Sequence, residues 1–450
     1  MISQKSSLPS LPWLALAWSC LVPGAASAAA SPPPAFKSWI DSNYPALEQL
    51  YRDLHQHPEL SFREEKTAAR LADELRKTGA EVTTRVGGHG LVAVLRNGPG
   101  RTVLFRTDLD ALPVVEQTGL AYASRLRTTN DAGIDVGVMH ACGHDIHMTS
   151  FIGSARLLAQ FKETWKGTLV FIGQPAEERG AGARAMLKDG LFARFPKPDF
   201  CLALHVNSEL PAGFVTAVEG HALANVDAVN ILIRGVGGHG AWPHKTRDPI
   251  VVAAQTVLAL QTIVSRETDP IDSAVVTVGS IHGGTKHNII PEDVKLQLTV
   301  RSFSDETRQR TLESIRRIAR NQALSAGMPE DRLPVVELED ESIAATYNQP
   351  ELARRLNGVF RGLVGPEKVP VRKPGMGGED FSEYGRTTDK IPSCIFWLGA
   401  VEPERVAESE RTGKPLPSLH SPQFKPVPEP TLKTGIAAST AAILELLRQP

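Results

Sequence analysis

Apolar strands that alternate with helices are the feature that most constrains how this chain of 450 residues can fold. Apolar, strand-like segments occur at 90–96, 102–106, 168–173 and 200–206, and helical periodicity occurs at 64–78, 149–161 and 183–188. Strands and helices in alternation indicate an α/β layer with a mostly parallel sheet. The turn sequence Asn97-Gly98-Pro99-Gly100 predicts a tight connection between the first two of these strands.

A different order of segments begins near residue 224. Strands are predicted at 227–234, 274–281, 294–301 and 334–339, and helices at 248–266 and 304–325. Asp248 followed by Pro249 favours a helix N-terminus, and Ser304 or Asp305 caps the second helix. The order β-α-β-β-α-β is the split, ferredoxin-like arrangement. Because 349–363, 394–398 and 432–448 return to the first pattern, we predict one discontinuous α/β domain with an inserted α+β domain.

The first 30 residues are typical of a secretory signal peptide. Lys5 is their only charged side chain, an apolar run extends from Leu11 to Val22, and small residues of the A-x-A type follow at 25–28. The run contains Pro12 and is shorter than the roughly 20 apolar residues that a membrane span needs. An uncleaved anchor helix and a lipoprotein anchor at Cys20 are the alternatives. No other stretch looks long and apolar enough to span, so we expect export to the periplasm or beyond, without a stable membrane anchor.

Charge and composition exclude several classes of protein. Lys and Arg total 49 against 50 Asp and Glu, so charge alone does not suggest a nucleic-acid-binding protein. Hydrophobic residues make up 42% and charged residues 22%, which excludes a chain that is disordered throughout. The 4 cysteines are too few for a disulfide scaffold, and Cys201 and Cys394 lie in apolar runs that predict buried thiols.

Five segments share one design, in which an apolar strand or a turn leads into acids or histidines. They are Leu104–Pro113, Met139–His147, Phe171–Glu178, Leu202–Val206 and Ser418–Phe424. In open α/β sheets ligands bind outside the carboxyl ends of the strands, and three of these segments place polar groups at strand ends. We therefore expect them to converge on a single pocket.

The residue types in this pocket favour a metal centre. Cys142 and His144 are two positions apart, and thiolate, imidazole and carboxylate are the ligands that Zn²⁺ prefers. The adjacent Glu177 and Glu178 point to opposite sides of an extended chain, so one can be a ligand and the other a proton shuttle. A metal is needed because water is a poor nucleophile, and Zn²⁺ lowers its pKa to about 7. Each residue alone also has a structural interpretation, such as a hydrogen-bonded His205, but the five segments together favour the metal.

Eight short motifs extend over nearly all of the chain beyond the leader. They are His55–Phe62, Asp108–Pro113, Met139–Asp145, Gln174–Glu178, Gly237–Ala241, Asn288–Pro291, Met376–Phe381 and Leu419–Phe424. In these motifs the chain resembles the metal-dependent amidohydrolases and carboxypeptidases of the aminoacylase-like family. It is most similar to the branch that contains hippurate hydrolases and hydrolases of indoleacetyl–amino acid conjugates.

The resemblance implies a role for each matching residue. Two divalent ions, Zn²⁺ by expectation with Mn²⁺, Co²⁺ or Ni²⁺ as alternatives, would be held by Cys142 as the bridge and by His144, Glu178, His205 and His420. Glu177 would be the general base, and Asp110 would orient a metal ligand. One departure from the relatives is Arg179, which intervenes between the Glu pair and the Gly-rich sequence that commonly follows it.

The resemblance also implies a homodimer or a higher homo-oligomer. His239 would reach the partner subunit's site and stabilise the oxyanion, and Asn288 and Arg301 would be candidates to bind the substrate carboxylate. A solvated turn is the alternative for His239, and a surface charge is the alternative for Arg301. The predicted division is then a signal peptide at 1–30, a linker at 31–38, a catalytic domain at 39–223 and 341–450, and a satellite (dimerisation or lid) domain at 224–340.

Three functions remain open at this point. The first is an exported di-metal hydrolase that cleaves the amide bond of N-acyl amino acids or small peptide-like conjugates. The second is a carboxypeptidase or dipeptidase that acts on free peptides. The third is a non-catalytic protein that binds a metal or ligand on the same scaffold, which would require loss of the base or of a ligand. All matched positions are present, so we favour the first, with a small molecule and not a nucleic acid as partner.

Overall fold

The computed structural model describes residues 33–339 and 342–448. The predicted signal peptide lies outside these residues. The predicted linker at 31–38 is wrong from residue 34 onward, because α1 (Pro34–Gln56) begins there. Pro34 stands at the first helical position, where proline is tolerated because its missing N–H would have no partner in the helix.

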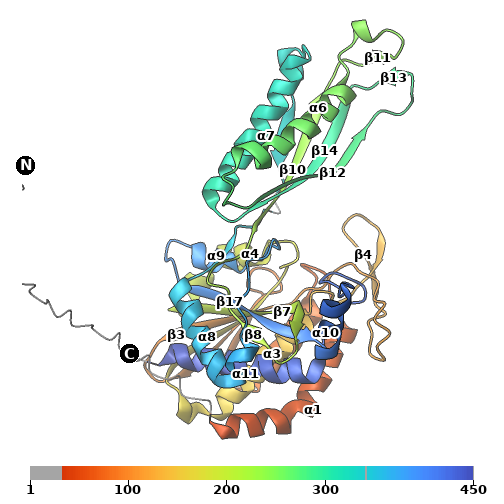
Figure 1. Cartoon of the computed structure of the whole chain (residues 1–450). Helices are drawn as coiled ribbons and strands as arrows, with labels where there is room; N and C mark the ends of the chain where they lie inside the picture. The colour runs from red at the N-terminus through yellow and green to blue at the C-terminus, as the bar shows by residue number, and fades with distance from the viewer. Residues whose placement is uncertain (1–32, 340–341, 449–450) are drawn as a thin grey trace, which may run out of the picture.

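A seven-stranded sheet forms the larger part of the molecule (Figure 1). Its strands, in order across the sheet, are β1 (Glu81–Thr84), β2 (Leu91–Asn97), β6 (Gly167–Gln174), β3 (Thr102–Asp108), β7 (Phe200–Pro211), β17 (Ser393–Val401) and β8 (Val215–Thr216). The four central strands β6, β3, β7 and β17 are parallel, and the outer strands pair antiparallel. The mostly parallel central sheet was predicted.

The connection between β2 and β3 is short, as predicted, but the two strands are not neighbours in the sheet. The two strands are close in sequence, but β6 lies between them and pairs with both. Their short turn therefore does not make a hairpin. The strand order depends on the insertion of β6, which lies about 60 residues farther along the chain. The sequence of the short turn carries no information about this long-range pairing.

Helices cover both faces of this sheet. One apolar core packs α1, α2 (Glu65–Arg76), α3 (His144–Gln160), α8 (Pro350–Val364) and α11 (Pro428–Leu447) against one face. The second core packs α4 (Gly182–Lys188), α5 (Leu191–Arg194) and α9 (Ser382–Arg386) against the other face. Cys394 belongs to the first core and Cys201 to the second, so these neighbouring thiols are buried on opposite faces and form no disulfide.

Residues between β9 (Gly220–Leu223) and β16 (Thr346–Asn348) form a second, four-stranded sheet that projects away from the first (Figure 1). Its antiparallel order is β12 (Ala274–Gly283), β14 (Asp293–Ser302), β10 (Asn225–Arg234) and β15 (Val335–Leu338). Helices α6 (Pro249–Thr262) and α7 (Asp305–Ser325) pack on it. The side chains of Asp248 and Ser304 accept hydrogen bonds from Ile250 N and Thr307 N, as expected for N-caps.

Helix α6 continues into a short π-helix (Ile263–Glu267), and the combined stretch is unusually apolar. By length and composition Pro249–Glu267 could cross a membrane, although only 33% of it is buried, so the expectation that no further stretch is apolar enough was wrong. One such helix is weak evidence for a span. Its exposed apolar side chains include Leu258, Val251 and Ile250, and they leave this face without a cover in the single chain.

The remaining described strands and α-helix are β4 (Arg127–Thr129) and β5 (Asp135–Gly137), which form a hairpin, β11 (Gly238–His239) and β13 (Ile289–Ile290), which pair with each other, and α10 (Pro403–Thr412). Four short 3-10 helices complete the described elements, at Lys162–Thr164, Pro243–Lys245, Glu330–Arg332 and Pro366–Lys368. Figure 1 shows β11 and β13 at the end of the smaller sheet that is farthest from the larger one.

Candidate functional site

Five side chains from four separate segments of the chain meet at the carboxyl ends of the central strands. They fall into two groups that share one thiol, Cys142 with His144 and His205, and Cys142 with Glu178 and His420. Within each group the potential ligand atoms all lie within 4.8 Å of one another. Cys142 Sγ is 3.6 Å from His205 Nε2, and Glu178 Oε2 is 3.4 Å from His420 Nε2. The structure therefore brings together all five side chains predicted as metal ligands.

The local backbone conformation sets the direction of three of these side chains. Gly143 adopts φ 77° directly before His144, which is the first residue of α3, so the helix begins five residues earlier than predicted. Ala176 precedes the Glu pair at φ 49°, and His420 itself has φ 67°. Non-glycine residues rarely occupy this left-handed region, and they cluster at functional sites where the surroundings enforce it. The Glu64 carboxylate accepts a hydrogen bond from Ala176 N at 2.8 Å and so stabilises the turn at Ala176.

Asp110 orients two of the candidate ligands. The main-chain oxygen of Asp110 is 2.8 Å from His144 Nδ1, and since a carbonyl only accepts, Nδ1 carries the proton. Nε2 of His144 is buried, has no hydrogen-bond partner and faces Glu178 Oε1 at 3.7 Å. The Asp110 carboxylate accepts from Glu178 N at 3.0 Å. The role predicted for Asp110, to orient a metal ligand, requires contacts of this kind.

His205 is oriented in the same way. Its Nδ1 donates to the main-chain oxygen of Val206 at 2.7 Å, which leaves Nε2 to face Cys142. Both buried histidines thus present a free ring nitrogen to the same small volume.

The charges of this volume fit a bound cation. Burial raises the pKa of the Cys142 thiol well above its ordinary value, and the nearby Glu178 and Glu177 raise it further. Burial also raises the pKa of Glu178 to about 8. A thiolate and several carboxylates are stable in such a place only beside positive charge, and Glu178 Oε1 is a second buried atom without a partner. The donor set therefore fits divalent metal ions.

Glu177 lies beside these groups and belongs to neither of the two that share Cys142. Its Oε2 is 3.8 Å from His144 Nε2, and the residue is almost fully buried. Burial raises the pKa of Glu177 well above its ordinary value, and the Glu379 and Glu178 carboxylates add to this effect. A carboxylate of high proton affinity next to the ligands has the properties of a general base.

A cavity of about 420 Å³ opens onto these residues. Cys142, Glu177, Glu178, His205 and His420 lie along one side, and Leu223, Val226, Ile343, Trp397 and Leu419 give it apolar walls. Arg301, at the end of β14, also lines it. The Arg301 guanidinium is half-buried and donates to the main-chain oxygen of Met376 at 2.6 Å, so it is not a free surface charge.

His239 and Asn288 are not part of this cavity. His239 lies in β11, where it pairs with Ile289 of β13, and Asn288 is the residue before Ile289. Both residues therefore lie at the far end of the smaller sheet (Figure 1). His239 is exposed there, and its ring lies 4.9 Å from that of Trp242. Within one chain neither residue reaches the other predicted site residues.

Arg179, the departure from the relatives' motif, turns toward the hairpin of β4 and β5. Its guanidinium donates to Asp131 at 2.8 Å and lies over the Phe62 ring. Its contacts tie the loop of the Glu pair to this hairpin and to Phe62.

Sequence reasoning missed a set of buried charges behind the site. Arg106, Asp108, His147, Glu379 and Asp380 are joined by hydrogen bonds and are almost entirely inaccessible. The available signals were a charged residue inside the apolar strand LFRTD and the acidic pair in MGGEDF. Neither signal alone shows that the two segments meet.

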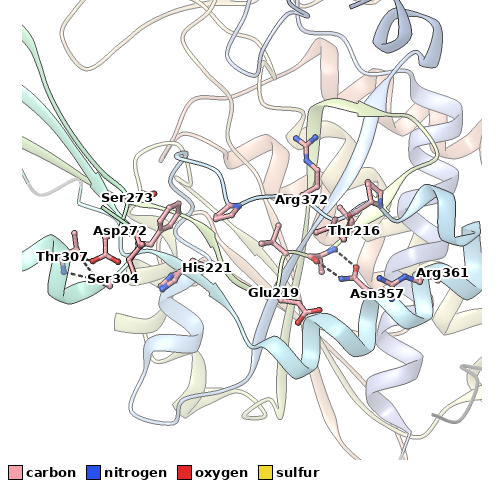
Figure 2. Close-up of a pocket in the computed structure, with 17 residues that line it drawn as sticks. Thr216, Glu219, His221, Asp272, Ser273, Ser304, Thr307, Asn357, Arg361 and Arg372 are labelled. Atoms are coloured by element: carbon pink, nitrogen blue, oxygen red, sulfur yellow. Dashed lines mark hydrogen bonds between the residues drawn. The ribbon is translucent and has the colours of Figure 1, made fainter. Parts of the chain in front are cut away.

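A larger cavity, of about 570 Å³, lies elsewhere in the described part of the chain (Figure 2). It lies where the two sheets join, and its lining includes Thr216, His221, Phe303, Asn357 and Arg361. None of the predicted site residues lines it, so its size alone does not make it the functional site.

Comparison with known proteins identifies relatives of this arrangement. The model of "Peptidase family M20/M25/M40" matches residues 104–415. Thermostable carboxypeptidase 1 of Saccharolobus solfataricus is 35% identical over 394 residues, which are 87% of this chain and 92% of the relative. N-acetyldiaminopimelate deacetylase of Streptococcus pneumoniae serotype 19F is 37% identical over 396 residues, which are 87% of this chain and 96% of the relative.

A solved structure gives the same result. A Bacillus subtilis protein described as a dinuclear metal binding peptidase from the M20 family is 30% identical. It superposes with a TM-score of 0.71, covering 91% of this chain and 100% of the other.

Proposed function

This chain belongs to the peptidase family M20/M25/M40, and on that premise we propose that it hydrolyses the amide bond of N-acyl amino acids or small peptide-like conjugates. The observation that carries the proposal is the pair of ligand groups that share Cys142, with the Glu177 carboxylate beside them. The third hypothesis, a non-catalytic binding protein, is disfavoured because neither the base nor any ligand is missing.

In the proposed site, two divalent ions would be held by Cys142, His144, Glu178, His205 and His420. Zn²⁺ is the metal we propose, because the set contains a thiolate and imidazoles. When bound, the ions supply Lewis acidity, which polarises the amide carbonyl and lets water lose a proton near neutral pH.

Glu177 moves the proton. As a carboxylate it accepts the proton of the attacking water, and its high proton affinity holds that proton until the leaving amine takes it. Burial in a cavity with apolar walls keeps other water away from this transfer. Asp110 keeps His144 and Glu178 in place during the cycle through the hydrogen bonds to His144 Nδ1 and Glu178 N.

The substrate class follows from the walls of the cavity. Arg301 is the one guanidinium among the residues that line it, and it is suited to bind a carboxylate of the substrate. Leu223, Val226 and Trp397 are suited to an apolar acyl or side-chain group. An N-acyl amino acid presents both a carboxylate and an acyl group next to a single amide bond.

Cleavage of free peptides is the second candidate function. The 35% identity to a thermostable carboxypeptidase favours it, because that relative covers as much of the chain as the deacetylase does. A panel of N-acyl amino acids and dipeptides, assayed on metal-reconstituted protein with product identification, separates the two. Turnover of dipeptides alone would replace the first proposal, and no turnover of any amide by metal-loaded protein would contradict both.

A homodimer or higher homo-oligomer is proposed from the same observations. His239 is exposed at the far end of the smaller sheet, where it can complete a site only in a second copy. The exposed apolar face of α6 and the edge strand β12 next to it offer a surface for that contact. Asn288, beside β13, would enter the partner's site together with His239.

Export is proposed from the leader alone. Its composition supports a cleaved signal peptide and a periplasmic or secreted enzyme. N-terminal sequencing of protein recovered from the producing cells, together with its distribution between cell fractions, tests this. An intact leader on cytoplasmic protein would contradict it.

A further inference from the structure

Behind the candidate metal centre lies a buried guanidinium with an unusual number of partners. Arg106 Nη1 is 2.8 Å from Asp108 Oδ2, Nη2 is 2.9 Å from Glu379 Oε1, and Nε is 3.0 Å from Gln174 Oε1. The side chain is fully buried. A buried charge is tolerated only when its hydrogen-bonding groups are satisfied, and this fork fixes its partners in orientation.

Asp108 uses both of its oxygens in this arrangement. Oδ2 accepts from Arg106, and Oδ1 is 2.8 Å from His147 Nδ1. Asp108, His144 and His147 have ligand atoms close enough to hold a metal ion. In the structure, however, the oxygens of Asp108 are already engaged by side chains of the protein.

His147 is engaged at both ring nitrogens. The main-chain N–H of Val206 donates to Nε2 at 2.9 Å, so Nε2 carries no proton. Nδ1 must then carry the proton and donate it to Asp108 Oδ1. This fixes one neutral tautomer and leaves no free lone pair for a metal ion.

The amide of Val206 needs this partner because the strands diverge here. The pairing of β3 with β7 ends at Arg106 and Ala203, three residues before Val206. Val206 directly follows the candidate ligand His205, whose Nδ1 donates to the Val206 carbonyl. The N–H that His147 accepts and the carbonyl that His205 contacts both belong to Val206, so the position of the main chain at Val206 sets the direction of the His205 ring.

We propose that Asp108 and His147 are positioning residues. Arg106 holds Asp108, and Asp108 and His147 together fix the main chain at Val206. The main chain at Val206 in turn orients the candidate metal ligand His205. The inference rests on the proposed role of His205 as a ligand. It assigns the buried group of Asp108, His144 and His147 to support of the centre, and not to a further metal site.

Two substitutions at one position separate the two hydrogen bonds of His147. His147→Gln can place a carbonyl oxygen near the position of Nε2, where it accepts from Val206 N. His147→Asn places its amide near the position of Nδ1, where it can donate to Asp108 but cannot reach Val206. Asp108→Asn is an independent, nearly isosteric change. It replaces one accepting oxygen by a donating N–H₂, which cannot accept a hydrogen bond, so the bond from either Arg106 or His147 is lost.

The measurement is Zn²⁺ binding to the full-length apoprotein, by chelator competition and by elemental analysis of the ions bound per chain. Removal of such supporting hydrogen bonds weakens metal binding by roughly 10- to 100-fold. We expect this loss, for one of two ions, in His147→Asn and Asp108→Asn, and an affinity near that of wild type in His147→Gln. His221→Gln, at the cavity of Figure 2, is the control for loss of a partly buried imidazole away from the centre.

Two outcomes would overturn the inference. If His147→Gln loses the ion as completely as His147→Asn, His147 is itself a ligand or supports the fold in general. If the Asn variants at both positions bind two ions as wild type does, the hydrogen bonds do not position His205. Because no substrate is used, a wild type that binds two ions without cleaving amides would contradict the proposed function and leave this test intact.

Discussion

At the scale of single residues, Glu177 is distinguished from its neighbour Glu178 by what surrounds it. Both carboxylates lie near His144, but Glu178 also groups with Cys142 and His420, whereas Glu177 groups with the buried Glu379 and Asp380. The two side chains are chemically identical, so the different roles proposed for them rest on these different neighbours. A matched pair of substitutions can therefore test the assignment.

We expect Glu177→Gln to lower kcat by about 10²- to 10⁴-fold with two metal ions still bound, because the amide cannot accept a proton. Glu178→Gln should instead lose metal. Steady-state kinetics and elemental analysis on the same preparations check both. Undiminished turnover in Glu177→Gln would show that Glu177 is not the general base. Equal metal loss in both variants would show that Glu177 is a metal ligand.

The residues of the centre could be predicted from sequence to a large extent. Cys142, His144, Glu178, His205 and His420 lie in short motifs whose residue types suit metal binding, and the structure places them together. Arg106 and His147 were not predicted as parts of one network. Their function depends on partners such as Glu379, which is 273 positions away from Arg106, and on an amide exposed by diverging strands.

At the scale of elements, the helix caps and the order of segments were predictable because they depend on local sequence. Asp248 and Ser304 cap their helices as expected. The separation of β2 from β3 in the sheet was not predictable, since the insertion of β6 between them is a long-range pairing. The hairpin of β4 and β5 was also missed, because its three-residue strands are too short to show a period.

The packing of α1 on α3 contains a buried ion pair with a pH dependence of its own. His55, near the end of α1, is 2.6 Å from Asp145 in the first turn of α3 and 3.1 Å from Glu116. Burial alone would lower the pKa of His55, but the hydrogen bonds to Asp145 and Glu116 outweigh it and raise the pKa to about 9. The folded protein thus holds this proton more tightly than the unfolded chain does.

The contribution of His55 to stability should be complete below pH 6.5 and should be lost as the pH rises to about 9. The loss is on the order of 3 kcal/mol, since one pKa unit corresponds to about 1.4 kcal/mol. Denaturant unfolding across this range should show the decline in wild type and not in His55→Gln. His57→Gln, two residues away and exposed, should decline like wild type. Parallel curves for wild type and His55→Gln would contradict the prediction.

At the scale of the whole molecule, the smaller sheet exposes apolar side chains that a second copy would bury. On α6, Leu258 is 72% exposed and Val251 52%, and Ile281 on the edge strand β12 is 52% exposed. Exposed apolar side chains of this kind next to an open strand edge are typical of an interface. The same surface explains why α6 has the composition of a membrane span while it packs on a sheet.

We expect wild type to have the mass of a dimer or a higher oligomer in light scattering, and Leu258→Glu to be monomeric at micromolar concentration. A symmetric contact would bury two unpaired carboxylates in this variant, which costs several kcal/mol. Val371→Glu changes a side chain that is 96% exposed outside the smaller sheet, and it should keep the wild-type mass. A fully active wild-type monomer would contradict the proposed assembly.

The proposed assembly makes a stricter prediction, because it would place His239 and Glu177 of one site on different chains. His239→Ala and Glu177→Gln should each be nearly inactive alone. When equal amounts are mixed and allowed to exchange subunits, about half of the dimers are mixed, and each mixed dimer contains one site with both residues intact. Activity should therefore recover to about a quarter of the wild-type value. If His239 served its own chain, every site in the mixture would lack one of the two residues, and no activity would return.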